Sequence, residues 1–318
     1  MKQFAYIDDG AEVHSVTPQE AAAANGSAQL IWIHLSLTDP ATKSFLTERL
    51  GLSDVVTSAL TALETRPRCE PMEGGALVNL RGMSLQEEPE SDPLVSIRLW
   101  IGRGCIVSLS RYTLRAMPPM CAAIKAHKVR DPGDFVAMLA DEITDQLDPD
   151  VAELGDRLDD CELVLDARRA FTLRRRVALV RAKAISYRRF VAPQRVALDR
   201  LSRLGAEWLE EDDRLHLSES ADRFARMTEE LEAVRERAAL MAEQITDLRA
   251  ELIDTRSLWL SVVALIFLPL TFLTGLLGMN VAGIPFAEEP WAFWGVVGVC
   301  FVLGTAVMVY FVRSRFLR

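Results

Sequence analysis

The chain has 318 residues, of which 50% are hydrophobic and 25% charged, and its formal net charge is −9. The length predicts about two domains, and the composition excludes a disordered, collagen-like or low-complexity protein. The acidic balance argues against a nucleic-acid partner, which would require a basic surface. Five cysteines with no C-x-x-C pair exclude a disulfide scaffold and an ordinary structural zinc site.

Residues 1–130 are predicted to form a cytoplasmic α/β domain. Helical spacing behind a capping residue predicts helices over Asp39–Leu50 and Ser53–Glu64. The chain contains no G-x-G-x-x-G, P-loop or G-x-S-x-G motif, and its four histidines have no metal-ligand spacing, so no enzyme is predicted. Apolar or alternating stretches predict five strands: Phe4–Ile7, Leu30–Leu37, Ala76–Leu85, Leu94–Ile101 and Cys105–Ser110.

Residues 131–217 are predicted to form a cytoplasmic helical hairpin. An acidic stretch, Asp141–Glu162, is followed by a basic stretch, Arg168–Arg189. Each run alone repels itself, so two antiparallel helices of opposite charge should pair through salt bridges or neutralise a neighbour. In the alternative interpretation, the acids attract or sense divalent cations near a pore mouth.

Residues 218–278 are predicted to form one long stalk helix that continues into a membrane, because no Gly or Pro interrupts residues 218–268. Apolar residues recur in alternating three- and four-residue steps, a heptad pattern that calls for partner helices. One protomer offers little to cover so long a stripe, so we expect oligomerisation around an axis. The stripe comprises Phe224, Met227, Leu231, Val234, Ala238, Met241, Ile245, Leu248 and Leu252.

Two charge-free runs, residues 258–277 and 291–312, are each long enough to cross a bilayer as a helix. The loop between them, residues 279–290, has no basic residue, whereas the tail, residues 313–318, and the segment before the first run contain arginines. Positive-inside bias therefore places both termini in the cytoplasm. The first residues contain no apolar signal region. We expect a multi-pass protein of the inner (cytoplasmic) membrane, with lipid as a partner.

The first span ends in Gly278, Met279 and Asn280. Glycine lets the helix end tightly, and an asparagine amide can offer its oxygen to a cation or to the water around it. The tripeptide is informative through its position, at the end of the first of two C-terminal spans and after a long stalk. This arrangement resembles the CorA superfamily of divalent-cation channels and transporters over essentially the whole chain.

The resemblance implies an α+β cytoplasmic domain with a long stalk helix and two C-terminal transmembrane helices, assembled as a funnel-shaped homopentamer. It implies that the Gly-Met-Asn turn forms the outer metal-selecting entrance, with Zn²⁺ or Mg²⁺ as the transported ion and no bound cofactor. The loop Val281–Ala287 and the soluble segments Glu64–Arg68 and Leu77–Gly82 look more like the ZntB zinc-transport branch. Proton coupling, implied for that branch, would have to use the funnel, the outer loop or water, because neither span contains an ionisable residue.

In such a pentamer, five Asn280 amides would hold a hydrated ion through its waters, and Glu288 and Glu289 would attract cations as a screened field. One face of the first span collects the small and hydroxyl groups that a water-filled path needs, and two leucines on it would form a hydrophobic gate. We expect Thr274, beside this face, to bond a backbone carbonyl instead. The predicted pore-lining residues are Ser257, Leu260, Ala264, Leu268, Thr271 and Gly275.

Other interpretations remain open. Within the same superfamily, the chain would be a Mg²⁺/Co²⁺ channel of the CorA type, and only the loop after Asn280 and the soluble segments favour zinc. From other classes, it would be a cytoplasmic enzyme tethered by a membrane hairpin, or a structural or sensor protein whose stalk oligomerises without conduction. The enzyme would need a catalytic constellation, yet Cys69, Cys105 and Cys121 have no plausible base in the sequence around them.

Overall fold

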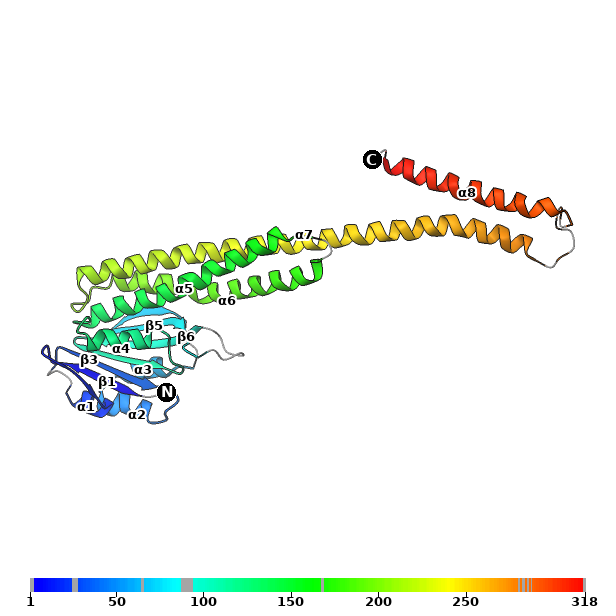
Figure 1. Cartoon of the computed structure of the whole chain (residues 1–318). Helices are drawn as coiled ribbons and strands as arrows, with labels where there is room; N and C mark the ends of the chain where they lie inside the picture. The colour runs from blue at the N-terminus through cyan, green and yellow to red at the C-terminus, as the bar shows by residue number, and fades with distance from the viewer. Residues whose placement is uncertain are drawn as a thin grey trace. The chain divides into compact units, whose positions relative to one another are not determined.

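The computed structural model describes residues 3–24, 28–63, 66–86, 94–166, 169–279, 281, 284, 286 and 288–316. The chain divides into two compact units, Met1–Val164 with Thr172–Ala242 and Leu165–Phe171 with Glu243–Arg318. The first unit contains a β-sheet and a set of long helices, and the second contains the two apolar helical segments. Figure 1 shows the course of the chain.

The first unit is built on a seven-stranded sheet with the strand order β2-β1-β3-β7-β6-β5-β4. Strands β3 and β7 are parallel, with Ile33 opposite Val107, and the other neighbouring pairs are antiparallel. The five predicted strands are confirmed to within two residues at each end. The strands are β1 (Phe4–Asp8), β2 (Val13–Val16), β3 (Leu30–Ser36), β4 (Arg68–Met72), β5 (Gly75–Met83), β6 (Leu94–Gly102) and β7 (Cys105–Ser110).

Two strands that the sequence did not predict, β2 and β4, are the two edges of the sheet. β2 reads Val-His-Ser-Val, with no fully buried residue, and β4 contains Pro71. Short, polar or proline-containing strands are typical of sheet edges, where half of the backbone groups need no strand partner. The apolar pattern that identified the central strands is therefore weak at the edges.

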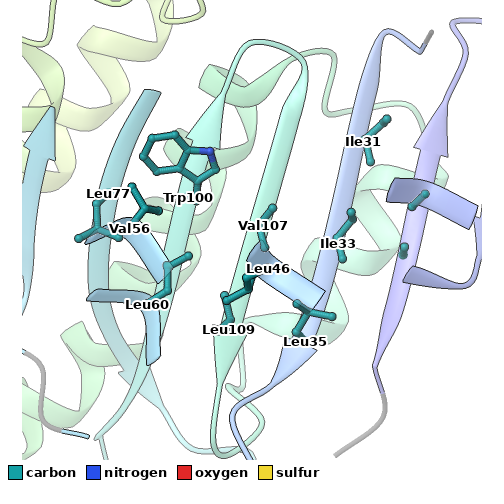
Figure 2. Close-up of a cluster of buried hydrophobic side chains, with 12 residues drawn as sticks. Ile31, Ile33, Leu35, Leu46, Val56, Leu60, Leu77, Trp100, Val107 and Leu109 are labelled. Carbon is teal, nitrogen blue, oxygen red and sulfur yellow. The ribbon is translucent and has the colours of Figure 1, made fainter. Parts of the chain in front are cut away.

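One face of the sheet is covered by α1 (Pro18–Ala23), α2 (Thr42–Ser44), the π-helical turn η1 (Phe45–Arg49) and α3 (Asp54–Thr61). Figure 2 shows their apolar side chains, such as Leu46 and Leu60, packed on Val107 and Trp100 of the sheet. Ser53 caps α3 as predicted, since its hydroxyl accepts a hydrogen bond from the Val56 N–H.

The single helix predicted over Asp39–Leu50 was wrong. The carboxylate of Asp39 accepts a hydrogen bond from the Ala41 N–H within a turn, and α2 begins only at Thr42 before giving way to η1. A side chain that bonds the backbone two residues on stabilises a turn, which delays the start of the helix. The second predicted helix also ends early, at Thr61, because Ala62 takes a non-helical conformation.

The opposite face of the sheet carries α4 (Met117–Lys125) and the start of α5 (Pro132–Leu163). The ring of Phe135 on α5 lies 4.9 Å from that of Trp32 on β3. Gly82 on β5 lets α5 approach closely, because a Cβ there would lie 3.1 Å from Cγ1 of Ile143. The sheet is therefore enclosed between two helical layers.

Long helices α5, α6 (Ala170–Ser202) and the first part of α7 (Glu211–Leu277) lie side by side in the first unit (Figure 1). The predicted apolar stripe on α7 faces inward, and its residues from Phe224 to Met241 are at most 2% exposed. The expectation that other protomers must cover the stripe was therefore wrong for this part, because α5 and α6 of the same chain bury it. Leu248 and Leu252, further along α7, are only half-buried.

The two oppositely charged helices bind mainly to α7. Arg223 of α7 contacts Asp145 and Asp148 of α5 at 2.6 and 3.1 Å, and Arg237 contacts Asp159 and Glu162 at 2.5 and 2.7 Å. In the same way, Arg188 of α6 forms an ion pair with Glu232 of α7. Lys183 and Asp150, 3.8 Å apart, link α6 to α5 directly. Of the two predicted outcomes, direct pairing is thus limited, among the described residues, to this contact, and neutralisation by a neighbour dominates, because α7 carries complementary charges of both signs.

A glutamine of α6 completes the sheet at Arg81 of β5. Strand β4 pairs with β5 only as far as Asn79. Beyond that point, the Gln194 amide oxygen accepts a hydrogen bond from the Arg81 N–H at 2.7 Å, and Gln194 Nε2 donates to the Arg81 carbonyl at 3.0 Å. Gln194 is 2% exposed, so one side chain satisfies two backbone groups that a further strand would otherwise use.

The start of α7 contains a buried acid, Asp213, which is 3% exposed. Its carboxylate accepts a hydrogen bond from the Glu210 N–H at 2.9 Å. Burial, with the nearby charges of Asp131 and Asp134, raises the pKa of Asp213 to about 6. A carboxyl whose pKa is higher in the folded than in the unfolded state lowers the free energy of unfolding at any pH where it is ionised. For Asp213 this destabilisation is fully present above about pH 6.

Asp213→Asn should therefore stabilise the protein at pH 7.5, by on the order of 1–3 kcal/mol, and leave its stability at pH 4 nearly unchanged. The asparagine oxygen can still accept from Glu210, while the ionisation cost disappears. Thermal unfolding of the full chain between pH 4 and 8 measures the difference. Asp212→Asn, whose side chain is 75% exposed, should leave the pH profile unchanged. Parallel profiles for Asp213→Asn and the unmodified chain would contradict the assignment.

Candidate ion-conduction site

The end of α7 and the helix α8 (Pro290–Phe316) are long and apolar enough to cross a membrane. Both runs that the sequence predicted as spans are helical. Most of their side chains are exposed in the single chain, including large ones such as Phe272 and Phe301. Exposed apolar helices of this length are typical of membrane spans, since a soluble domain would bury them.

Within the second unit, one stripe of α7 faces α8. A Cβ on Gly304 of α8 would lie 4.0 Å from Cγ2 of Ile266. Val262 is 7% exposed and Ile266 is half-buried, as are three further residues at helical spacing. These three residues are Leu270, Leu273 and Leu277. The sequence did not reveal this stripe, because its three- and four-residue spacing is hidden in a segment that is apolar on all sides.

The predicted pore-lining residues lie on the other side of the same helix. With about 3.6 residues per turn, Leu260, Ala264 and Thr271 project roughly opposite to the stripe that faces α8. All six predicted residues are exposed in the single chain, with Leu260 and Leu268 at 72% and 75%. The structure thus brings them to one free face of the first span, which leaves that face open for an axial path or for contact with other protomers.

The hydroxyl groups on the first span donate to its own backbone. Thr271 Oγ1 donates to the Phe267 carbonyl at 2.7 Å, and Thr274 Oγ1 donates to the Leu270 carbonyl at 2.9 Å. The expectation for Thr274 is confirmed, and Thr271 behaves in the same way. Each hydroxyl oxygen keeps lone pairs that can face water or an ion's hydration shell.

At the C-terminal end of the first span, the Gly278 N–H donates to the Thr274 carbonyl at 2.9 Å, which ends α7. Met279 follows and is 48% exposed. Asn280, the central residue of the predicted site, lies outside the described residues. Glu288 and Glu289 are exposed just before α8, as a diffuse field on cations requires.

The described residues contain no group of three or more His, Cys, Asp and Glu side chains that could hold a metal ion. Each histidine has a partner in the chain: His34 Nδ1 lies 2.7 Å from Ser108 Oγ, and the other three lie near carboxylates. Burial lowers the pKa of His34 to about 3, so it stays neutral. Each histidine thus has a hydroxyl or carboxylate of the same chain beside it.

The cysteines of the first unit are poor nucleophiles. Burial raises the pKa of Cys69 and of Cys105 to about 11, and it also raises the pKa of Cys121. A thiol with such a pKa is protonated at neutral pH, whereas thiolate is the reactive form. The three thiols considered for a tethered enzyme thus lack activation.

Comparison with known proteins gives a consistent result over the whole chain. The family of CorA-like Mg²⁺ transporter proteins matches residues 27–313. The zinc transport protein ZntB of Pectobacterium atrosepticum is 31% identical over 303 residues, covering 95% of this chain and 92% of the relative. The divalent cation transporter CmaX of Pseudomonas aeruginosa is 31% identical over 288 residues, covering 90% of this chain and 86% of the relative.

Solved structures show the same architecture. The full-length CmaX protein superposes with a TM-score of 0.78 at 29% identity, covering 98% of this chain and 97% of that one. The CorA magnesium transporter from Methanocaldococcus jannaschii superposes with a TM-score of 0.80 at 18% identity, covering 99% and 98%. An α+β domain, one very long helix and two apolar C-terminal helices therefore form a CorA-like fold, and the chain belongs to the family of CorA-like Mg²⁺ transporter proteins.

Proposed function

We propose that this chain transports divalent metal ions across the inner membrane, with Zn²⁺ as its main cargo, through the axial pore of a homopentamer. The observation that carries the proposal is the family match over residues 27–313, which includes the Gly-Met-Asn turn at the end of the first span. Relatives called zinc transport proteins align with 95% of the chain at 31% identity, which favours zinc.

The proposed path begins at the outer turn. Five Asn280 amides can hold a hydrated ion without stripping its waters, which suits ions that lose water reluctantly. The exposed Glu288 and Glu289 raise the local cation concentration. Below them, Leu260 and Leu268 on the free face of α7 narrow the path and gate it by excluding water.

Assembly around an axis is supported by apolar side chains that the single chain leaves uncovered. Leu179 and Val196 on α6, and Leu240 and Ile253 on α7, are each at least 60% exposed. Isolated exposed apolar side chains are ordinary, but several large ones on the long helices, together with the exposed membrane spans, fit an oligomer. The number five comes from the resemblance to the superfamily.

Orientation follows from charge. Arg249 and Arg256 precede the first span, and Arg313 follows the second on α8, whereas no basic residue occurs in the sequence between the spans. The positive-inside rule then places the sheet domain and the C-terminus in the cytoplasm. Ions would enter at the Gly-Met-Asn turn on the opposite side.

The second candidate is a Mg²⁺ or Co²⁺ channel. It is favoured by the description of the matching family, which names Mg²⁺. Amide oxygens and water are hard ligands that accept either ion, so the Gly-Met-Asn turn does not separate the two candidates.

Flux measurements separate the candidates. The purified full chain in liposomes should carry Zn²⁺ faster than Mg²⁺ or Co²⁺, with a zinc-sensitive and a magnesium-sensitive dye recorded in parallel. An inward proton gradient should change the zinc rate if transport is proton-coupled. Mg²⁺ flux without Zn²⁺ flux would favour the second candidate, and no flux of any divalent ion would refute transport.

A further inference from the structure

A pocket of about 200 Å³ opens on the first unit, at the end of the sheet beside the last turn of α3. Three arginines line it: Arg81 on β5, Arg98 on β6, and Arg111, directly after β7. Arg81 pairs with Ser96 in the sheet register. Side chains two residues apart on a strand share a face, so Ser96 and Arg98 point to the same side as Arg81. The sheet therefore brings three arginine side chains to one small concavity, of which Arg81 already donates to the Leu94 carbonyl.

Arg98 is a buried cation whose hydrogen bonds are incomplete. It is 5% exposed, its Nη2 donates to the Ala62 carbonyl at 2.6 Å, and its Nε has no hydrogen-bond partner among the residues that the structure describes. Burial, with the charges of Arg111 and Arg81, lowers the pKa of Arg98 to about 10, so the group stays charged at neutral pH. In the described part of the chain, neither Arg98 nor Arg111 has a carboxylate within ion-pair distance. A buried charge without a counter-ion destabilises the fold, and a bound anion would relieve that cost.

A second unsatisfied polar group lies beside Arg98. Asn79 is its cross-strand neighbour in the register of β5 and β6, and Asn79 is 1% exposed. Both its amide nitrogen and its amide oxygen are without a hydrogen-bond partner in the described structure. Two adjacent buried polar side chains with unmet hydrogen bonds are unusual in native folds. Of the two, only Arg98 lines the pocket, so Arg98 is the group that a bound anion could satisfy.

The rest of the pocket fits a compact ligand with an apolar part. Leu37, Leu63 and Val95 line it together with the ring of Tyr112. Leu63 is 88% exposed and stands at the rim. Guanidinium groups bind phosphate through two parallel hydrogen bonds, and a phosphate monoester carries about −1.5 to −2 charges at neutral pH.

We propose that this pocket binds the phosphate group of a small phosphomonoester, held by Arg98 and Arg111 with the apolar substituent against Leu37 and Leu63. The site lies wholly in the first unit, away from the membrane spans in sequence, and so does not depend on which ion is transported. It would give the cytoplasmic domain a metabolite-binding role separate from conduction.

Isothermal titration of the full chain in detergent, at low salt, with phenyl phosphate tests the proposal. We expect one site per chain, with inorganic phosphate weaker because it lacks the apolar part, and benzoate at least tenfold weaker because it carries one charge. Arg111→Gln should weaken phenyl phosphate binding at least tenfold. Arg103→Gln is the matched control, because that side chain is 86% exposed and pairs with Glu207 outside the pocket.

Arg98→Lys is a second variant, which keeps the buried charge and removes the planar guanidinium group. It should also weaken phenyl phosphate binding. Its melting temperature serves as the control that the fold is intact. Absence of phenyl phosphate binding, or equal binding by Arg111→Gln, would overturn the proposal. So would binding that appears only after the acids of the sequence 87–93 are neutralised (Glu87→Gln, Glu88→Gln, Glu90→Gln and Asp92→Asn), because the chain's own carboxylates would then be the occupant.

Discussion

Asn280→Ala is expected to reduce Zn²⁺ uptake into liposomes at least tenfold and to leave the oligomeric state and melting temperature of the protein unchanged. If the protein is a ring of five protomers, the change removes five amides from the entrance at once, and with them the first position where a hydrated ion can bind. A single polar residue beyond the end of α7 should contribute little to the stability of the fold. Dye-based flux and size-exclusion chromatography on the same preparation measure the two effects.

Two companion variants separate binding at the entrance from simple attraction. Asn280→Asp should lower the flux while raising ion occupancy, because five carboxylates would hold a divalent ion too tightly to release it. Glu288→Ala with Glu289→Ala should cause a mild loss that disappears at high salt, since these charges act through a screened field. Normal zinc uptake by a correctly assembled Asn280→Ala protein would remove the main support for this site.

Gly133→Ala is expected to lower the stability of the first unit by about 3 kcal/mol. Gly133 lies in the first turn of α5, where the start of α7 approaches. A Cβ there would lie 2.8 Å from the backbone carbonyl oxygen of Trp208 and would collide with the carboxylate of Asp213. A backbone atom cannot rotate away as a flexible side chain can, so one of the two segments must shift.

Gly155→Ala on the same helix is the matched control. A Cβ at this position would meet its nearest neighbour, Glu230 Oε1, at 3.7 Å, an ordinary contact. Replacing glycine by alanine inside a helix stabilises it by about 0.5–1 kcal/mol. The two substitutions should therefore move the thermal midpoint in opposite directions, and a similar shift for both would contradict the proposed close approach at Gly133.

The central strands and the long helices could be predicted because buried elements need apolar residues at regular spacing, and this spacing is visible in the sequence. β6 and β7, buried on both faces, appear as apolar runs with clear ends. Which helices bury the apolar stripe on α7 could not be predicted. A heptad pattern indicates that a helix needs partner helices, but it does not distinguish partners in the same chain from partners in another protomer. Here α5 and α6 supply them up to Met241.

The candidate transport site could be proposed from the sequence because charge-free spans and the Gly-Met-Asn tripeptide are local sequence features. The arginine pocket could not, because Arg81 lies on β5, Arg98 on β6 and Arg111 directly after β7, and only the pairing of these strands brings them together. Nothing in the spacing of these residues distinguishes them from the many surface arginines of the chain.

Gln194 has a consequence for the order of events during synthesis. It lies 113 residues after Arg81, whose backbone it satisfies. A ribosome adds about 5–20 residues per second, so this stretch of β5 would emerge roughly 6–23 s before its partner exists. During that interval its free N–H and C=O can pair with a strand of a neighbouring nascent chain. Slow translation of α5 and α6 would lengthen this exposure, so the yield of soluble protein should depend on elongation rate in this region.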